Sequence, residues 1–521
     1  MGNDSINFER FYRKGQFFLG PPSFSTMDGW NTHPIDPGFM VSAHPDVPIT
    51  HEQDGDKSII LIGHLLDPRN PEHTNETILN RLFTRLQDKT SLERFPQLTD
   101  NLCGRWVMII RVGSESILLP DAAAQRQVHY THYQGMTYCA SQAKVIADYL
   151  GLEPDPEAEE MLETCRKEMG EHFDHQFWWP GNTTLFKGVK RLLPNHILDL
   201  NTGEVSRFFG KDALEPLMID QAVSTACDIL RGACECALHR CSRLTLACTS
   251  GWDTRVLMAA AFPFRKRIFY YTNRRYGWPL RHPDLSIPGK LLEKSGVEHH
   301  IIKIKPDMDK NFAAIYRNNV DIPHHHWGVK SEGELRNLPH NTIVLSGNVS
   351  EICRCFFGAE KGFKGITARE LAEHAKEKTS LLETDFSITA LAEWLADVEF
   401  GKGFHLLDMF YWEQRAGSWA ATCHDEVAIA HETIPPFNCR ELLVTLLSVD
   451  EKYRRPPEHE LYRRIVEELW PDGLKEPINP PMPPPDLVEK WSQRVETMVR
   501  RCLPDSFSTI LKQIADSWRS M

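Results

Sequence analysis

The sequence predicts a two-domain protein, with an α+β domain over residues 1–210 and an α/β domain over residues 215–521. Two observations predict this division. Short apolar runs separated by turn residues fill the first ~200 residues, which is typical of a β-rich domain. From about residue 219, helically spaced apolar residues alternate with short apolar runs, the pattern of a parallel sheet covered by helices. A chain of 521 residues is long enough for two domains of ordinary size.

The strands expected in the first domain are short apolar runs bounded by glycine or polar residues. Val112 and Gly113 lie between two such runs and predict a hairpin. The runs lie at residues 58–63, 105–111, 116–119 and 137–140, and within residues 191–203.

The second domain is expected to begin with a helix, because apolar residues recur at helical spacing between Ile219 and Leu238. Strands and helices then alternate, and the chain after about residue 365 is mainly helical. Residues 476–486 are too rich in proline for a helix or a central strand. The expected strands lie at residues 243–248, 267–271, 300–304 and 341–347, with helices at residues 255–261 and 285–295.

Composition narrows the function classes. The formal net charge is −12, which argues against partners such as nucleic acid or an anionic membrane surface. No run approaches the ~18 apolar residues of a membrane span, and the polar start at Met1, Gly2 and Ser5 carries no apolar signal segment. The thirteen cysteines contain no Cys-x-x-Cys pair. We therefore expect a cytoplasmic protein with reduced thiols and no zinc.

The loop at residues 249–254 is the first candidate site. It follows the first strand of the α/β domain, and ligands of such sheets bind beyond the carboxyl ends of the strands. Small hydroxylated residues and a glycine before a helix can present N–H groups and hydroxyls to an anion. Asp253 would lie among phosphates only with a cation such as Mg²⁺. The alternative is a polar loop with Thr254 as the helix N-cap.

This loop resembles the Ser-Gly-Gly-x-Asp-Ser pyrophosphate loop of the ATP pyrophosphatases, and the chain resembles the asparagine synthetase family. Ser250 replaces the first glycine of the motif, and its side chain would crowd a pyrophosphate. The resemblance implies ATP binding by the loop residues Thr249, Ser250, Gly251, Asp253 and Thr254.

Residues 345–351 are similar to the family's Leu-Ser-Gly-Glu-Gly-Ser-Asp-Glu. The resemblance implies that Gly347 and Ser350 contact the nucleotide, and that Glu351 holds Mg²⁺ together with Asp253. Asn348 falls where the family carries Glu, or Tyr in its β-lactam-forming branch, and Asn cannot act as a base. A structural turn is the alternative interpretation.

Two further segments carry the remaining candidate residues. Residues 411–419 and 436–442 resemble the helical pair that closes the synthetase site, which implies catalytic roles for Glu413 and Arg415. A helix-surface ion pair is the alternative for each. The family's pyrophosphate-binding lysine follows a Leu-Pro turn. Direct alignment puts Ile478 at its position, and Lys475 is the nearest substitute.

The first domain resembles the N-terminal-nucleophile (Ntn) glutaminase of these synthetases at residues 102–106, 119–122, 140–143 and 184–189. The resemblance therefore implies an Ntn-hydrolase-like α/β/β/α domain followed by a PP-loop synthetase domain. That glutaminase uses an N-terminal cysteine. Here Gly2 follows Met1 and the first cysteine is Cys103, so no intrinsic glutaminase is expected. The β-lactam-synthetase branch shows the same loss.

The resemblance implies an ATP-dependent ligase that adenylates a small-molecule or peptide carboxylate, releases pyrophosphate and forms a carbon–nitrogen bond. The nitrogen would come from ammonia or an amine, supplied by the substrate or by a partner enzyme, and a homodimer is left open. Three alternatives stay open: an amidine-forming enzyme, an inactive binding subunit, and a hydrolase with a Ser or Thr nucleophile. The run His324-His325-His326 is expected in a solvated loop, with substrate contact as the alternative.

Overall fold

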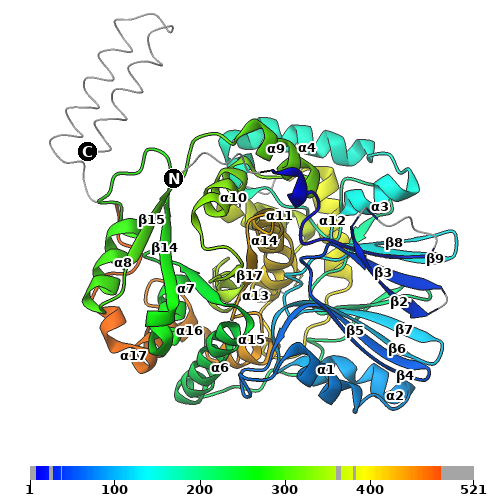
Figure 1. The fold of residues 1–521 in the computed structure, drawn as a ribbon, viewed down its shortest axis with the longest axis horizontal. Helices are drawn as coiled ribbons and strands as arrows, with labels where there is room; N and C mark the ends of the chain where they lie inside the picture. The colour runs from blue at the N-terminus through cyan, green and yellow to red at the C-terminus, as the bar shows by residue number, and fades with distance from the viewer. Residues whose placement is uncertain are drawn as a thin grey trace, which may run out of the picture.

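Three β-sheets organise the protein in a computed structural model that describes residues 7–22, 27, 29–36, 38–358, 365–379 and 383–482 (Figure 1). Two of the sheets have six strands with antiparallel pairing, and the third has five parallel strands. The described residues do not include Met1, Gly2 and Ser5, which carry the prediction of no signal segment and no N-terminal nucleophile. They also do not include residues 483–486 of the proline-rich segment.

The strands of the two antiparallel sheets all come from residues 17–207. The first sheet has the order β10-β8-β9-β1-β3-β2, with β1 at Phe17–Gly20, β2 at Asn31–Asp36, β3 at Phe39–Ala43, β8 at His129–Tyr133, β9 at Met136–Ala140 and β10 at Lys190–Arg191. The second has the order β12-β11-β7-β6-β5-β4, with β4 at Ile49–Asp54, β5 at Lys57–Leu66, β6 at Cys103–Val112, β7 at Glu115–Pro120, β11 at His196–Asp199 and β12 at Val205–Arg207.

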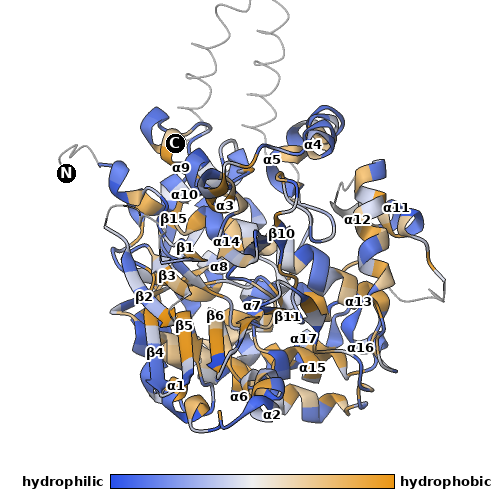
Figure 2. Cartoon of the chain, turned by 90° about the vertical axis from the view of Figure 1, so that its right-hand side faces the viewer, coloured by the Kyte–Doolittle hydropathy of each residue, from blue (hydrophilic) through white to orange (hydrophobic). Residues whose placement is uncertain are grey.

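Strand β5 shows why its sequence is almost continuously apolar. Ile60 and Ile62 pack between the two sheets, whereas Ile59 and Leu61 face the opposite way, toward helix α1 at Asn75–Phe83. Figure 2 shows β5 and β6 as mainly hydrophobic strands. On the outer face of the first sheet, helix α3 at Ala143–Leu150 packs against β1 and β9. The layers are therefore helix, sheet, sheet and helix.

The parallel sheet has the strand order β15-β14-β13-β16-β17. Helices cover both faces, because alternating residues of β14 enter different cores: Tyr270 packs with α6 and α7, and Tyr271 packs with α10. The chain order reverses between β13 and β16, which makes this edge the switch point of a doubly wound sheet. The elements are β13 at Arg243–Ala247, β14 at Ile268–Arg274, β15 at His299–Lys303, β16 at Thr342–Leu345, β17 at Glu432–Ile434, α6 at Ile219–Arg240, α7 at Trp252–Ala260, α8 at Pro283–Lys294, α9 at Lys310–Asn319 and α10 at His325–Asn337.

The remaining helices come from both regions of the chain. A rare π-helical segment at Tyr411–Ala420 connects α13 directly to α14. Among the described residues, no helix is long and apolar enough to cross a lipid bilayer. The helices are α2 at Lys89–Glu93, α4 at Pro156–Met169, α5 at Phe173–Gln176, α11 at Ala368–Thr379, α12 at Asp385–Ala396, α13 at Leu406–Phe410, α14 at Ala421–Val427, α15 at Arg440–Leu447, α16 at Glu451–Arg454 and α17 at Glu460–Leu469.

The structure confirms the expected strands and helices of both regions, including the hairpin around Val112 and Gly113. It also confirms the mixed class, with a five-stranded parallel sheet beside antiparallel sheets. Residues 475–482 form no helix or strand, as expected for the described part of the proline-rich segment. The division at residues 210 and 215 stays a prediction.

The expectation of a solvated loop at His324–His326 is wrong. Helix α10 begins at His325, and His324 is only 2% exposed. The His324 ring lies between the Glu426 carboxylate, 3.0 Å from Nδ1, and the Phe177 carbonyl, 2.8 Å from Nε2. A buried carboxylate needs hydrogen-bond donors, which explains why a histidine is drawn inside here.

Candidate active site at the switch point of the parallel sheet

The loops that follow β13 and β16 meet at the carboxyl edge of the sheet. The two strands pair in parallel register, with Leu246 opposite Leu345, so their loops emerge side by side. The Ser350 hydroxyl donates a hydrogen bond to Asp253 Oδ1. A Cβ atom on Gly347 would lie 2.7 Å from the Asp253 Cβ, so only glycine fits there. The structure thus brings together Asp253, Gly347 and Ser350, as the sequence predicts.

Arg354 joins this group, although no sequence signal marked it. Its Nη2 lies 2.7 Å from Asp253 Oδ1 and 4.0 Å from Glu351 Oε1, and its side chain is 13% exposed. The guanidinium therefore lies between the two carboxylates that were expected to hold Mg²⁺. Burial and the Asp253 charge raise the pKa of Glu351, and Arg354 opposes them.

The turn that places these side chains is strained. Val349 has φ 81°, in the left-handed region that β-branched residues rarely adopt. Such conformations cost about 1–3 kcal/mol and cluster at functional sites. The Tyr462 hydroxyl donates a 2.8 Å hydrogen bond to the Ser350 carbonyl and so supports the turn from α17.

The described residues do not fit a Mg²⁺ ion held by Asp253 and Glu351. Mg²⁺ requires near-octahedral oxygen ligands at about 2.0–2.1 Å. Here an arginine takes the place beside Asp253 Oδ1, and the described residues contain no group of three or more His, Cys, Asp or Glu side chains placed to hold a metal ion. Magnesium in this protein stays a prediction from the resemblance.

The first loop has a defined internal hydrogen-bond pattern. The Thr249 and Thr254 hydroxyl oxygens are 2.9 Å apart, and the Gly251 N–H donates to Thr249 Oγ1 over 3.2 Å. Helix α7 begins at Trp252 with Gly251 as its N-cap, so the alternative that Thr254 is the N-cap is wrong. The hydroxyls and the first amides of α7, which lack partners within the helix, can together receive an anion.

Ser250 faces Asp284, a residue that the sequence did not single out. Both its N–H, over 2.9 Å, and its hydroxyl, over 2.6 Å, donate to Asp284 Oδ1 at the start of α8. The hydroxyl that was expected to crowd a pyrophosphate is therefore engaged by a neighbouring helix.

A strap at residues 473–479 packs against this loop. The buried Arg255 guanidinium donates to the carbonyls of Gly473, Glu476 and Pro477. The Asn479 N–H donates to the Ser250 carbonyl over 3.1 Å. The strap therefore holds the Ser250 backbone through its carbonyl, while Asp284 holds it through its N–H.

Arg415 lies on the π-helical segment, close enough for its charge to act on Glu351. Its guanidinium donates to the Gln176 carbonyl and side-chain oxygens and lies 4.1 Å from the Trp419 ring centroid. Burial lowers the pKa of Arg415 to about 10, while Tyr411 and Glu351 help to keep it charged. This placement agrees with an inward polar group, and its catalytic role stays a prediction.

Glu413 lies on the same segment but faces elsewhere. Its carboxylate is fully buried and pairs with Arg207 of β12. It also accepts hydrogen bonds from Asn195 Nδ2 over 3.0 Å and Trp394 Nε1 over 2.8 Å. The structure therefore places Glu413 in a contact between the antiparallel sheets and the helical region.

Asn348 contacts a histidine that the sequence did not single out. Its Nδ2 lies 3.2 Å from His424 Nε2, which is also 3.4 Å from Ser346 Oγ. Burial lowers the pKa of His424 well below its usual range, so the ring is neutral. Because Nε2 accepts from the Asn348 amide, the ring proton lies on Nδ1, which is a buried donor without a partner among the described residues.

Lys475 does not join the cluster, because its ammonium pairs with Asp472 at 2.7 Å and the two side chains are 63% and 65% exposed. We therefore expect Lys475→Ala to change pyrophosphate release by less than about threefold and stability by less than about 0.5 kcal/mol. Lys89→Ala, which removes another exposed lysine that pairs with Glu115 away from the strap, is the matched control. A selective loss of about tenfold or more would instead support the pyrophosphate-binding role that the resemblance implies.

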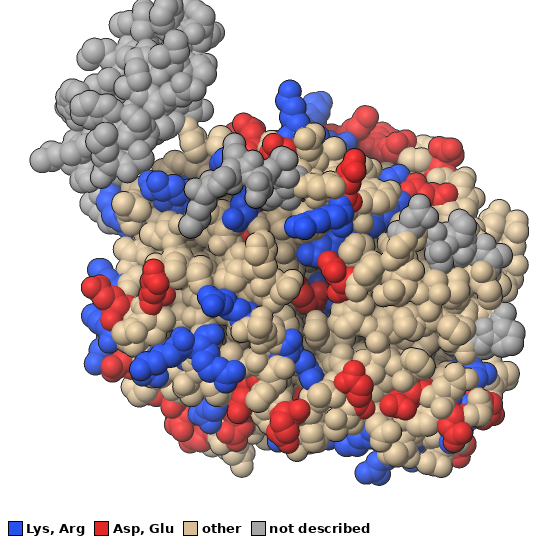
Figure 3. Space-filling view, viewed as in Figure 1, with Lys and Arg blue, Asp and Glu red and all other residues tan. Residues whose placement is uncertain are grey.

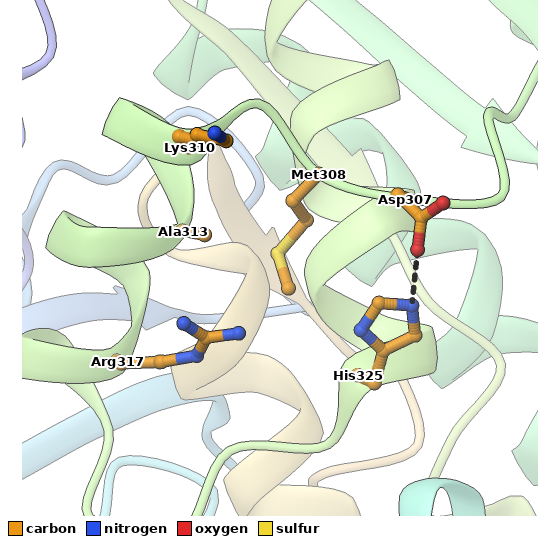
Figure 4. A pocket seen from close by; sticks show the side chains of 6 residues that line it. All are labelled: Asp307, Met308, Lys310, Ala313, Arg317 and His325. Carbon is orange, nitrogen blue, oxygen red and sulfur yellow. Dashed lines mark ion pairs between the residues drawn. The ribbon is translucent and has the colours of Figure 1, made fainter.

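The described residues also form a cavity away from the switch point. A cavity of about 220 Å³ lies between α9 and α10, lined by Asp307, Met308, Lys310, Ala313, Arg317 and His325 (Figure 4). It is smaller than the roughly 300–1,000 Å³ of typical ligand pockets. Two of the lining side chains, Asp307 and His325, lie 4.0 Å apart. Figure 3 shows acidic and basic side chains interspersed over this face of the molecule, without one dominant charge.

Comparisons with known proteins add little to this geometry. No family model matches the sequence. No curated protein matches it either. Among solved structures, the chain is similar to glutamine phosphoribosylpyrophosphate amidotransferase from B. subtilis complexed with ADP and GMP, with 11% identity and a TM-score of 0.24, over 76% of this chain and 90% of that chain.

A second solved structure is glutamine-dependent NAD+ synthetase from Acinetobacter baumannii in complex with ADP. It shows 11% identity and a TM-score of 0.19, over 60% of this chain and 74% of that chain. TM-scores this low assign neither a fold nor an activity to this chain.

Proposed function

We propose that this chain is an ATP-dependent ligase that adenylates a carboxylate, releases pyrophosphate and transfers the acyl group to ammonia or an amine. One observation carries the proposal: Asp253, Ser350 and Glu351 meet beside a hydroxyl-rich loop at the switch point of a doubly wound sheet. Nucleotides bind at this position in sheets of this kind.

The described residues support specific roles. The Thr249 and Thr254 hydroxyls and the first turn of α7 would receive phosphate oxygens. The Arg415 charge acts on Glu351 from the π-helical segment, and its guanidinium would attract a substrate carboxylate. These groups would place the carboxylate against the α-phosphate, and orientation of this kind lowers a reaction barrier substantially.

The nitrogen source is proposed to be ammonia or an amine, from the substrate or from a partner enzyme. Cys103 lies in β6 and is fully buried, and burial raises the pKa of its thiol well above the usual range. Its thiol is therefore not an available nucleophile.

Pyrophosphate release from ATP tests the proposal. The purified protein is incubated with ATP, ammonia or amines, and a panel of carboxylates, and products are identified by mass spectrometry. Gly347→Ala should lower turnover by about tenfold or more, because its Cβ would displace Asp253. Gly289→Ala in α8, whose Cβ would meet only His299 Nδ1 at 3.4 Å, is the matched control. An amidine product would indicate the amidine-forming alternative.

A binding subunit without catalysis is the second candidate. It is favoured by Arg354, which lies where the resemblance implies a metal ion. Bound ATP without pyrophosphate or AMP, across the whole panel, would support this candidate and exclude the ligase.

A further inference from the structure

Arg354 is a charged group at the switch point that the proposed ligase chemistry does not yet use. Its guanidinium contacts Asp253 at 2.7 Å and approaches Glu351 to 4.0 Å. The Arg354 carbon at the centre of the guanidinium also lies 5.8 Å from the Tyr462 ring centroid, which limits where the side chain can move.

We infer that Arg354 supplies the resident positive charge of this site, so that the protein holds nucleotide phosphates with a guanidinium instead of a metal ion bound by Asp253 and Glu351. This inference rests on the proposed function for the identity of the ligand. The inference gives Arg354 the role of neutralising the phosphate charge, a role that the resemblance assigns to Mg²⁺.

The local charge balance supports the inference. Asp253 and Glu351 contribute two carboxylates, and Arg354 and Arg415 contribute two guanidinium groups that act on the same cluster. Two guanidinium groups beside two carboxyl groups leave little attraction for a divalent cation. A cation between the two carboxylates would also have to displace an arginine that is already paired.

The hydrogen-bond inventory supports it as well. Among the described residues, the buried Arg354 Nε–H has no hydrogen-bond partner. This N–H lies on the guanidinium that already contacts Asp253, and it is free to donate to an acceptor such as a phosphate oxygen. A guanidinium has five N–H donors in a planar fork, and this fork suits bidentate contact with a phosphate while one nitrogen stays on Asp253.

Two binding experiments on the full-length protein test the inference. In the first, calorimetry measures ATP binding with MgCl₂ and with EDTA. The wild-type affinity should change by less than about threefold on chelation, and Arg354→Gln should weaken binding about tenfold or more in EDTA. Arg354→Lys, which keeps the charge, should recover part of the loss.

In the second, Mn²⁺ alone is titrated and followed by electron paramagnetic resonance. The wild type should not bind it, whereas Arg354→Gln should, because Asp253 and Glu351 are then free to ligate. The double variant Arg354→Gln/Glu351→Gln removes one charge of each sign and should lose the Mn²⁺ site. Arg463→Gln, on the exposed face of α17, is the control.

The outcomes separate the two ideas. A wild type that binds Mn²⁺ itself, or ATP only with Mg²⁺, would overturn the role of Arg354 and leave the ligase intact. A wild type that binds no ATP in either buffer would refute the ligase, and the Mn²⁺ titration would still decide Arg354: no gain of binding in a folded Arg354→Gln variant overturns the inference.

Discussion

Glu413→Ala should lower the free energy of unfolding by about 3 kcal/mol, because it would leave the buried Arg207 guanidinium with only the half-exposed Asp397 carboxylate, 3.3 Å away, as its partner. The Glu413 and Arg207 side chains are at most 1% exposed, so water cannot replace the Glu413 carboxylate. Asn195 and Trp394 would also lose their acceptor. Urea unfolding followed by circular dichroism measures the change.

The pKa of Glu413 gives the pH dependence of this contact. Burial alone would raise that pKa, but Arg207 and Asn195 outweigh burial and hold it below its usual range. An acid whose pKa is depressed by folding stabilises the protein above its unfolded pKa of about 4.3. This contribution is lost as the pH falls through the lower folded value. The stability difference between wild type and variant should therefore shrink on acidification.

Two controls separate a structural role from a catalytic one. Glu460→Ala removes a partly exposed carboxylate that pairs with Arg463 and should cost less than about 0.5 kcal/mol. Glu413→Leu with Arg207→Met replaces the buried pair by apolar residues and should recover the part of the loss that comes from the unpaired arginine charge. A Glu413→Ala variant that unfolds like the wild type but releases no pyrophosphate would contradict the structural assignment and support the catalytic role.

Much of the fold could be predicted because its strands are apolar on both faces. Strands such as β5 and β13 are buried between layers, so their sequences stand out as short apolar runs. Strands β2 and β8 carry polar residues on both faces, as in the segment His129–Tyr133, and no periodicity marked them. Strand β17 has only three residues within a helical region, and it is defined by pairing with β16.

The site divides in the same way. Asp253 and Ser350 could be predicted together because each follows a strand, and parallel strands end at the same edge of the sheet. Arg354 follows Cys353 in a segment whose apolar residues indicate a core, and only the three-dimensional turn aims it at Asp253. Asp284 lies 34 residues from Ser250, a contact that no local spacing can indicate.

The interface between the two regions was also beyond sequence analysis. Glu432 of β17 pairs with Arg105 and Arg126 of the antiparallel region. Burial raises the pKa of Glu432, but the two arginines outweigh it and lower this pKa to about 2. Partners more than 300 positions apart carry no pattern in common. Such pairs specify how two layers dock, and hydrophobic periodicity does not encode them.

Asp253→Asn should reduce pyrophosphate release by on the order of 100-fold or more. The substitution removes the negative charge that orients Arg354 and that strengthens the hydrogen bond from Ser350. Asparagine has nearly the same shape and keeps one oxygen for Ser350, so the fold should persist and the loss should be electrostatic. Turnover with ATP and the best substrate pair measures the effect, with circular dichroism as the fold check.

The control is Asp220→Asn on α6, an exposed aspartate that pairs with Arg464 and lies outside the cluster. It should leave turnover within about twofold, as expected for a surface substitution. A 100-fold loss confined to Asp253→Asn places this carboxylate in the working site. Near-normal turnover of a folded Asp253→Asn variant would remove the switch point from the chemistry, because no other carboxylate of the described loop at residues 249–254 could replace it.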